Sequence, residues 1–372
     1  MGPLLNYDDY TIGWICALQV EVLAARFMLD SRHDGVFPGK FGDDNDYIPG
    51  TINGHNVVIV GLPQKSTGTV SAACLVQSLV TSFRNIRYGL MVGIGAGVPG
   101  VDLKPDIRLG DVVVAAPGDD SKDAQGVVGY ELGKETVEGF VKTGWLYPTD
   151  RRLQNAIGNV QMEAEFSGKN VFTTHLEAFK ATPSGRKFLH PGPEIDLLYE
   201  AEKNAGQATY KLIPRRPRDS LDPVVHYGLI ASGNKLIKNA RLRDELRDRF
   251  RIICFEMEAA GLMNTLPVAV IRGICDYADA HKNDKWHHYA AATAAAYAKG
   301  LLQVIGADPS SNPQPQALIG KWALDLAALP PKYSLSLKVL RYDISSITRK
   351  VLELSQYPNN FDLSSLNTDQ YH

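Results

Sequence analysis

YGLMVGIGAGV, at residues 88–98, is a stretch without charge. Its first part, residues 88–94, has the composition of a strand buried on both faces of a sheet, and we expect its glycines to form a turn at the strand end. Similar apolar runs lie at residues 11–18, 111–116, 224–232, 252–255 and 268–275, and helical patterns lie at residues 20–29, 66–83, 239–250, 258–264 and 286–305. Strands that alternate with helices predict an α/β fold.

A hairpin signal near the amino terminus argues against a purely parallel sheet. Residues 47–51 and 56–61 are apolar runs on either side of Asn53-Gly54, a dipeptide that favours two-residue hairpin turns. Residues 30–46 contain Gly, Pro, Asp and Asn and are expected to form an exposed loop. We therefore predict a single three-layer α/β domain over residues 8–306, with a mixed central β-sheet flanked by helices.

Three further stretches depart from this pattern. Residues 117–222 are rich in Gly, Lys, Glu and Pro, and we interpret them as a large insertion over one face of the core. Residues 307–316 have the composition of a Pro/Ser-rich linker, and residues 317–372 are expected to form a partly helical C-terminal tail.

Composition excludes several classes of protein. The chain has 372 residues and a formal net charge of −2, so a broadly basic nucleic-acid-binding surface is not expected. No apolar run is long enough for a membrane span and no signal peptide is visible, so we expect no membrane partner and a cytoplasmic location. The four cysteines show no CxxC spacing and are expected to be buried, without a zinc site. The glycines of residues 93–100 are not followed by a helix, so they do not predict a dinucleotide cofactor, and we expect no cofactor and no metal.

Three short motifs could carry chemistry, and each also has a purely structural explanation. Glu256 and Glu258 stand where a strand passes into a helix; they could bind sugar hydroxyls or only interact with the helix dipole. Asp276 ends an apolar strand, where α/β sheets place their sites, but an aspartate there can also be a helix N-cap. Glu21 follows the first strand and, taken alone, is explained by capping or solvation.

Six stretches, in this order, resemble the nucleoside phosphorylase/nucleosidase superfamily, the group of purine nucleoside phosphorylases and methylthioadenosine/S-adenosylhomocysteine nucleosidases. They are IGWICALQVE at 12–21, GLMVGIGAGV at 89–98, LGDVVVA at 109–115, GLIASGNKLI at 228–237, FEMEAAG at 255–261 and VIRGICDYAD at 270–279. The segments RGICDYADAHKND and YAAATAAAYAKGLL also resemble the domain at the N-terminus of many fungal NOD-like receptor proteins. The resemblance implies a homo-oligomer, a dimer or larger, and a purine nucleoside as substrate.

The resemblance also implies roles for single residues. Asp276 matches the aspartate that protonates N7 of the departing purine, and Glu21 matches the glutamate that deprotonates the attacking water. Arg272 matches the arginine that helps to hold this water, Glu258 the glutamate that binds the ribose hydroxyls, and Met257 the methionine that packs against the sugar. The other residues expected at the substrate are Glu256, Gly95, Ile94, Cys275, Leu236 and Ile237; the last two fall beside the base, with Leu236 in place of the usual aromatic residue.

These roles agree with the chemistry of the bond. Cleavage of an N-ribosidic bond builds negative charge on the purine, so an acid at N7 accelerates it. Asp276 would then hold a proton near neutral pH, which needs an apolar, water-poor site. Glu21, Met91 and Ile94 stand where related phosphorylases bind phosphate, and a carboxylate repels phosphate. We therefore expect hydrolysis of an adenosine-like purine nucleoside to free base and ribose.

Three alternatives stay open from the sequence. The first is a phosphate-dependent purine nucleoside phosphorylase, and the second is a catalytically silent purine-sensing module. The third is a nucleosidase that acts on a nucleotide such as ATP, with Arg215, Arg216 and Arg218 bound to the 5′-phosphates. For that basic cluster a solvated surface position is the favoured interpretation.

Overall fold

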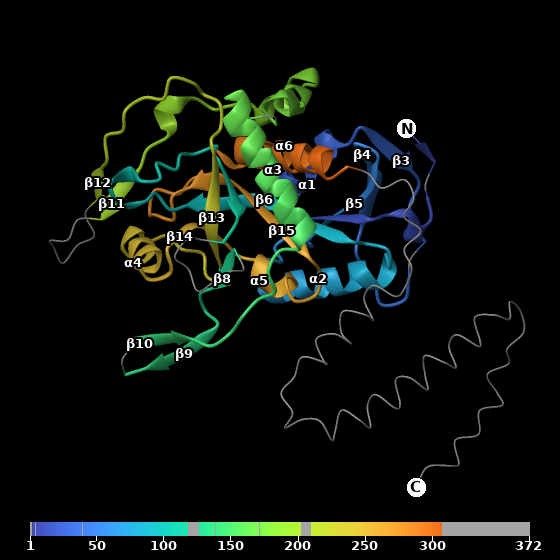
Figure 1. The fold of residues 1–372 in the computed structure, drawn as a ribbon, viewed down its shortest axis with the longest axis horizontal. Coiled ribbons are helices and arrows are strands. Elements are labelled where there is room, and N and C mark those ends of the chain that lie inside the picture. The colour runs from blue at the N-terminus through green and yellow to red at the C-terminus, as the bar shows by residue number, and fades with distance from the viewer. Residues whose placement is uncertain are drawn as a thin grey trace, which may run out of the picture. The chain divides into compact units, whose positions relative to one another are not determined.

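The computed structural model describes residues 2, 3, 5–38, 40–117, 126–137, 139–170, 172–201 and 210–306 (Figure 1). In this part of the chain, an 11-stranded mixed sheet has the order β1-β3-β4-β5-β2-β6-β14-β13-β7-β15, and β8 pairs with β13. Its strands are β1 (Gly2–Pro3), β2 (Ile12–Cys16), β3 (Ser31–Asp34), β4 (Tyr47–Ile52), β5 (His55–Gly61), β6 (Tyr88–Gly97), β7 (Val112–Ala115), β8 (Val127–Gly129), β13 (Val225–Ser232), β14 (Ile252–Glu256) and β15 (Val268–Asp276). Two small hairpins are β9 (Gly133–Thr136) with β10 (Gly139–Lys142), and β11 (Tyr199–Ala201) with β12 (Tyr210–Leu212).

One end of the large sheet closes on itself. β6 pairs with β14 and also, in parallel, with β15, so the strands β6, β14, β13, β7 and β15 form a ring. The predicted hairpin is present as β4 and β5, which pair antiparallel around Asn53 and Gly54. The predicted mixed α/β sheet is therefore confirmed.

Helices cover both faces of the sheet (Figure 1). α1 (Gln19–Met28), α3 (Arg151–Ser167) and α6 (His287–Ile305) pack around one buried core, and α2 (Thr69–Ser82) and α5 (Ala259–Leu262) pack into the other. α4 (Ala240–Phe250) lies against β14. The short 3-10 helices are η1 (Tyr7–Asp9), η2 (Val101–Leu103), η3 (Thr173–Ala181), η4 (Gly185–Phe188) and η5 (Pro193–Ile195). Every helix of the described residues is too short or too polar to cross a bilayer.

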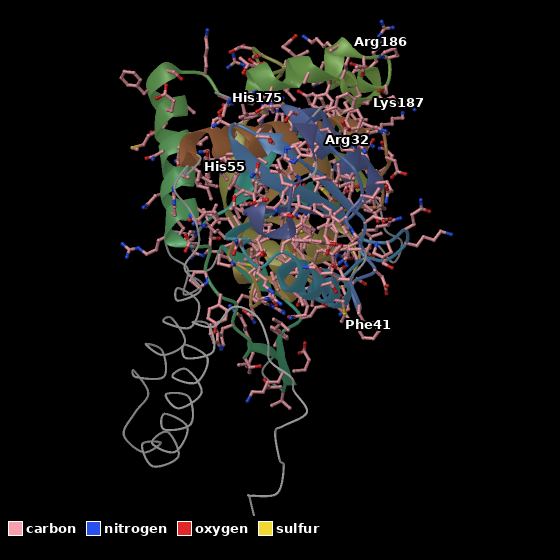
Figure 2. The ribbon with its side chains drawn as sticks, turned by 90° about the vertical axis from the view of Figure 1, so that its right-hand side faces the viewer. Arg32, Phe41, His55, His175, Arg186 and Lys187 are labelled. Atoms are coloured by element: carbon pink, nitrogen blue, oxygen red, sulfur yellow. The ribbon has the colours of Figure 1, made fainter. Side chains whose placement is uncertain are left out.

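The Ala-rich helix α6 lies directly on the sheet. Its residues from Tyr289 to Ala298 are all buried, and a Cβ at Gly273 of β15 would overlap the backbone of Ala290. Small side chains thus let helix and strand backbones approach closely. Two histidines labelled in Figure 2 contact its carboxyl-terminal end: Nε2 of His55 lies 3.1 Å from the Leu302 carbonyl oxygen, and Nε2 of His175 lies 3.1 Å from Oε1 of Gln303.

The prediction of an exposed loop over residues 30–46 is wrong in part. Ser31–Asp34 form β3, which pairs with β4. The reason is His33, which is buried between the Tyr10 hydroxyl at 2.8 Å and Oγ1 of Thr51 at 2.8 Å. A polar side chain with both ring nitrogens satisfied can enter a core that hydropathy alone would not assign to it.

The stretch predicted as an insertion contributes to the core as well as covering it. β8 adds a strand to the main sheet, parallel to β13, with Val127 and Val128 fully buried. Phe172, Phe179 and Phe188 are also buried and join the core that α6 forms. The predicted linker and C-terminal tail, residues 307–372, lie outside the described residues.

Candidate active site

A pocket of about 390 Å³ opens where β6, β14 and β15 end and where α1 begins. This volume is within the range of small-molecule sites. Every substrate-binding or catalytic residue expected from the sequence lines it except Arg272, which is buried directly behind it. The pocket is lined by Ala17, Leu18, Glu21, Thr67, Ile94, Gly95, Ala96, Lys235, Leu236, Ile237, Phe255, Glu256, Met257, Glu258, Cys275, Asp276, Lys282 and His287.

Glu21 is fixed by backbone amides. It lies in the first turn of α1, and its Oε2 accepts hydrogen bonds from the amides of Ala17 at 2.7 Å and Leu18 at 2.9 Å. Its Oε1 accepts one from the Ile94 amide of β6 at 2.8 Å. Burial raises the pKa of Glu21, although Arg272 and the amides oppose this. The result is an oriented carboxylate with increased basicity.

Arg272 is completely buried among carboxylates. Its Nη2 donates to Oε2 of Glu256 and lies 3.9 Å from Oε2 of Glu258. Burial disfavours its charge, but Glu256, Glu258 and Glu21 outweigh this and raise the pKa of Arg272 further. Its Nε and Nη1 are buried and have no hydrogen-bond partner among the described residues.

The glycines of β6 make room for these charges. The prediction of a glycine turn after residue 94 is wrong, because the strand continues to Gly97. A Cβ on Gly93 would lie 2.5 Å from Nη1 of Arg272 and closer still to Oε1 of Glu21. A Cβ on Gly95 would lie 2.6 Å from Sγ of Cys254. Residues without side chains therefore let a carboxylate and a guanidinium meet over the sheet.

Glu256 and Glu258 differ in their surroundings. Glu256 is held by Arg272 and by the amides of Glu258 and Ala259, at 3.0–3.1 Å, and its side chain has no exposed surface. Glu258 has one amide donor, from Gly68 at 3.2 Å. Burial and the charge of Glu256 raise the pKa of Glu258 to about 7. Glu258 is thus the carboxylate with free acceptor capacity towards the pocket.

Asp276 has a partner that the sequence did not indicate. Nζ of Lys282 lies 2.6 Å from its Oδ2, and its Oδ1 accepts a hydrogen bond from the Ala278 amide at 2.8 Å. Asp276 is buried, as the expected role requires, but the ammonium beside it was not part of that expectation. Lys282 is in a polar loop six residues after Asp276, and sequence gives no signal for the path of such a loop.

The rest of the wall is mainly apolar. Leu236 is exposed and Ile237 is buried beside it. Cys275 is buried, and its Sγ lies 3.2 Å from Oδ2 of Asp276; burial raises the pKa of this thiol far above its usual range. Of the four cysteines, Cys74 is exposed, which corrects the expectation that all are buried. His287, the first residue of α6, also lines the pocket.

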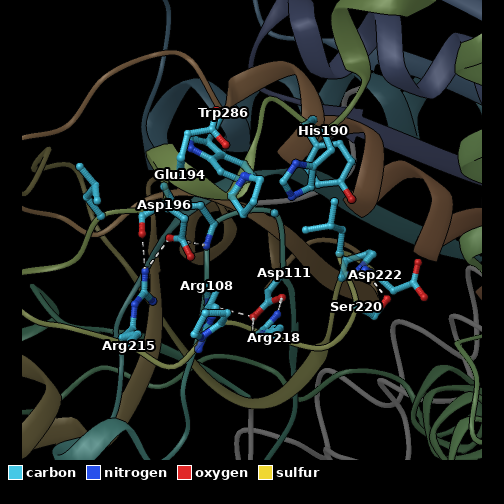
Figure 3. A pocket seen from close by; sticks show the side chains of 18 of the residues that line it. Arg108, Asp111, His190, Glu194, Asp196, Arg215, Arg218, Ser220, Asp222 and Trp286 are labelled. Atoms are coloured by element: carbon cyan, nitrogen blue, oxygen red, sulfur yellow. Dashed lines mark hydrogen bonds and ion pairs between the residues drawn. The ribbon is translucent and has the colours of Figure 1, made fainter.

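The basic cluster of the insertion lies at a second cavity of about 470 Å³ (Figure 3). Arg215 and Arg218 form ion pairs there, at 2.7 Å with Asp196 and at 2.6 Å with Asp111. The side chain of Arg215 is 6% exposed and that of Arg218 24%, so the favoured interpretation of a solvated cluster is wrong for both. They do not line the pocket of Glu21, so the alternative of phosphate binding at that pocket is not supported either.

In the parts of the chain that the structure describes, no three His, Cys, Asp or Glu side chains are grouped to hold a metal ion.

Comparisons with known proteins agree on the family and the fold. The family model of the phosphorylase superfamily matches residues 11–305. The structure is similar to futalosine hydrolase of Helicobacter pylori, with a TM-score of 0.51, 16% identity, and coverage of 78% of this chain and 97% of that one. It is equally similar to the 5′-methylthioadenosine/S-adenosylhomocysteine nucleosidase of the same organism, at a TM-score of 0.51 and 16% identity over 78% and 97% of the two chains.

Relatives in sequence are longer proteins. A nucleotide-binding leucine-rich repeat (NLR)-like protein of Hyaloscypha variabilis is 43% identical over 307 residues, which are 82% of this chain and 30% of that protein. The ATP nucleosidase Cap17 of Escherichia coli is 26% identical over 245 residues, 64% of this chain and 40% of that protein. The chain therefore spans less than half the length of these relatives.

Proposed function

Because this chain belongs to the phosphorylase superfamily, we propose that it is a purine N-ribohydrolase that cleaves an adenosine-like nucleoside to free base and ribose. One observation carries this proposal. A single pocket brings together a carboxylate beside a buried guanidinium (Glu21 and Arg272), a second carboxylate with free acceptor capacity (Glu258) and an acidic group at a strand end (Asp276). These groups match what hydrolysis of an N-ribosidic bond requires.

Glu21 and Arg272 are proposed to hold and activate the attacking water. Oε1 of Glu21 and Nη1 of Arg272 both lie over Gly93, and Nη1 has no protein partner. A water between them would donate to the carboxylate and accept from the guanidinium, so its lone pair can turn towards the sugar. A carboxylate whose pKa is raised by burial is a better base near neutral pH than an exposed one.

Glu258 is proposed to bind the ribose 2′- and 3′-hydroxyls. Glu258 lines the pocket, and two hydroxyl donors would replace the water that its burial removes. Glu256 already accepts from Arg272 and two amides, so we assign it to positioning Arg272 rather than to the substrate. Met257 lines the pocket between them and would pack against the sugar.

Asp276 is proposed to act at N7 of the purine. It lies in the same pocket as Glu21 and Glu258, at the end of β15, with Leu236, Ile237 and Cys275 forming apolar walls for a planar base. Protonation at N7 neutralises the negative charge that the departing base acquires, an effect worth about 10²–10⁴-fold in rate.

Hydrolysis is favoured over phosphorolysis by the charges of the pocket. Four carboxylates line it, those of Glu21, Glu256, Glu258 and Asp276, and the ammonium of Lys282 is paired with one of them. Arg272 is enclosed by the first three. Met91 lies in the core and Ile94 presents only an apolar side chain, and the carboxylates outnumber the buried cations, so the charges around the described pocket repel phosphate.

A nucleotide substrate is the second candidate, and the loop at the sugar end favours it. Thr67 lines the pocket and the Gly68 amide donates to Glu258, so the segment that begins with Lys65 and Ser66 leads into the proposed ribose site and precedes the amino terminus of α2. A lysine and two hydroxyls at a helix N-terminus suit a 5′-phosphate chain. The similarity to an ATP nucleosidase supports the same substrate.

The test is product analysis by chromatography. The purified protein is incubated with adenosine, inosine, guanosine, methylthioadenosine and ATP, each with and without phosphate. Free base and free ribose (or ribose 5′-triphosphate from ATP) without phosphate are expected. Base release only with phosphate, together with a sugar 1-phosphate, would show a phosphorylase. No base release from any of them would favour the purine-sensing module.

Two variants test the assignments. Glu21→Gln and Asp276→Asn keep size and are expected to lose turnover while the melting temperature stays close to that of the wild type. Glu163→Gln, an exposed position on α3, is the matched control and should keep full activity. Turnover near the wild-type rate in either active-site variant would refute that residue's role.

A further inference from the structure

We propose that Lys282 supplies the proton that Asp276 passes to the purine, so that the acid of this site is an ion pair and not an aspartate alone. This inference rests on the proposed N-ribohydrolase activity. It names a residue that neither the motifs nor the composition of the chain singled out.

The geometry of the pair supports it. Nζ of Lys282 lies 2.6 Å from Oδ2 of Asp276, and the two side chains are 17% and 3% exposed. Both residues line the pocket. The other oxygen of Asp276 accepts from the Ala278 amide at 2.8 Å, which fixes the carboxylate plane. A pair so far from solvent is unlike the exposed ion pairs that contribute little, and it stands where the departing base needs a proton.

The loop that carries Lys282 is anchored at the preceding residue, His281. The ring of His281 stacks on Tyr199 of β11, with centroids 3.7 Å apart and an interplanar angle of 15°. Oδ1 of Asp279 accepts from the His281 amide at 2.8 Å. These contacts hold the neighbouring lysine towards the pocket, so its position does not depend on the substrate alone.

The charged neighbours of Lys282 come from three elements. Asp276 and Cys275 of β15, Asp284 of the same loop and His287 of α6 interact with it, and Glu21, Glu256, Glu258 and Lys235 face the same pocket. Burial works against the ammonium, but Asp276 outweighs it and raises the pKa of Lys282 above its usual range. The lysine therefore carries its proton throughout the neutral and mildly alkaline range.

In the proposed step, protons move only among Lys282, Asp276, Glu21, the purine and water. The bond between C1′ and the purine breaks, and its electron pair goes to the base. Asp276 gives N7 a proton that it receives from Lys282, which is left as a neutral amine. The water oxygen bonds to C1′ and its proton goes to Glu21. Solvent then returns a proton to Lys282 and takes one from Glu21, so water is the only co-reactant.

The first experiment compares pH profiles of kcat/KM for the full chain and for Lys282→Met, with the best natural nucleoside or nucleotide as substrate. The wild type should keep its activity into the alkaline range, because Lys282 stays protonated there. The variant lacks this proton donor, so its activity should fall at a lower pH than that of the wild type. At pH 8 the expected loss is about 10²–10⁴-fold. An unchanged alkaline limb would overturn the proposal.

A second substrate separates proton donation from folding. The leaving group of p-nitrophenyl riboside is p-nitrophenolate, a stable anion that needs no proton. Lys282→Met should therefore hydrolyse it almost as fast as the wild type, while losing activity on the purine substrate. An equal loss on both substrates would mean that the lysine only shapes the pocket.

Two further variants complete the design. Lys282→Arg keeps the positive charge but cannot give up its proton, so it should not restore purine hydrolysis. Full rescue by arginine would reduce the role of Lys282 to electrostatics and contradict proton supply. Lys285→Met, in the same loop and exposed, is the control and should behave as the wild type. If the wild type releases no base from any substrate, the proposed function fails. If the wild type is active and Lys282→Met has the same activity and pH profile, the proposed function stands and only this inference fails.

Discussion

Gly93 shows at the scale of one residue why the site can exist inside a sheet. Oε1 of Glu21 and Nη1 of Arg272 both occupy the space that a side chain at this position would fill. Neither charged group can retreat, because Arg272 has no exposed surface and Glu21 is held by three backbone amides. The absence of a Cβ at this one position is therefore a condition for the proposed water site.

Gly93→Ala is expected to abolish activity and to lower the free energy of unfolding by about 1–3 kcal/mol, because the methyl group overpacks a buried charged cluster. Product release and chemical denaturation measure the two effects. Gly158→Ala is the matched control: a Cβ there meets nothing within 4 Å, and its position inside α3 predicts a gain of about 0.5–1 kcal/mol. An active Gly93→Ala variant would show that Glu21 and Arg272 need not meet over the strand.

Glu258 predicts a dependence of stability on pH. Burial and Glu256 raise its pKa from 4.5 to about 7 in the folded protein, so the folded state binds more protons between these values. The contribution of Glu258 to the free energy of unfolding is fully present below about pH 4.5 and is lost as pH rises through 7. The contribution lost is on the order of 3 kcal/mol. Glu258→Gln should therefore have a higher melting temperature than the wild type at pH 8 and a similar one at pH 5. Its activity should be reduced at both pH values. Glu163→Gln should show no such difference, and equal melting temperatures at pH 8 would contradict the assignment.

Among the residues that line the pocket, those that belong to a sequence motif could be predicted, and those outside any motif could not. Glu21, Glu258 and Asp276 follow apolar strands, so their places at strand ends could be foreseen, and the structure brings them into one pocket. Lys282 and His287 reach the same pocket from a loop and from a helix start, where no periodicity specifies direction.

At the scale of elements, Asp111 joins segments that are far apart in the chain. It precedes β7, and its carboxylate accepts from Arg218 at 2.6 and 2.7 Å, from the Val224 amide at 2.9 Å and from the Arg108 amide at 2.8 Å. Nε2 of His226 in β13 lies 2.9 Å from it. One buried carboxylate thus fixes the stretch before β13 against the strand beside it.

Asp111→Asn should lower the free energy of unfolding by about 3–5 kcal/mol at pH 7, because it leaves Arg218 without its charged partner. Burial opposes its charge, yet Arg218 and His226 lower the pKa of Asp111, so the stabilisation is present above pH 4 and lost as pH falls through its folded-state pKa. The difference in free energy of unfolding between Asp111→Asn and the wild type should therefore become smaller at acidic pH. Asp248→Asn removes half of an exposed pair and should cost less than about 1 kcal/mol. Equal denaturation midpoints for the two variants would contradict this role.

Elements were predictable where hydropathy decides them. The strands β2, β5, β6, β13 and β15 and the helices α1, α4 and α6 lie within a few residues of their predicted ranges, because each buries a continuous apolar run or stripe. β3 and β8 were missed for different reasons. β3 buries a histidine, and β8 is a strand of three residues inside a polar stretch, too short for alternation to be recognised.

At the scale of the molecule, closure of the sheet concentrates the chemistry. β6 pairs with both β14 and β15, which brings Ile94, Glu256 and Asp276 to the same end of the ring. This closure could not be foreseen from sequence, because strand order depends on contacts distant in the chain. The resemblance supplied the fold, and local patterns alone supplied only an open mixed sheet. The expected homo-oligomer stays a prediction.

The last prediction concerns the boundary of the domain. The family model ends at residue 305 and α6 ends at Ile305, and all residues of the proposed site lie before them. A chain of residues 1–306 should therefore unfold in one cooperative transition and keep the kcat/KM of the full chain on the same substrate. Calorimetry and product chromatography of both chains side by side test this. The region aligned with this chain forms only 30–40% of its longer relatives, so independent activity would show that this region suffices for the proposed chemistry in this chain. A truncated chain that folds but is inactive would instead place an essential contribution beyond residue 306.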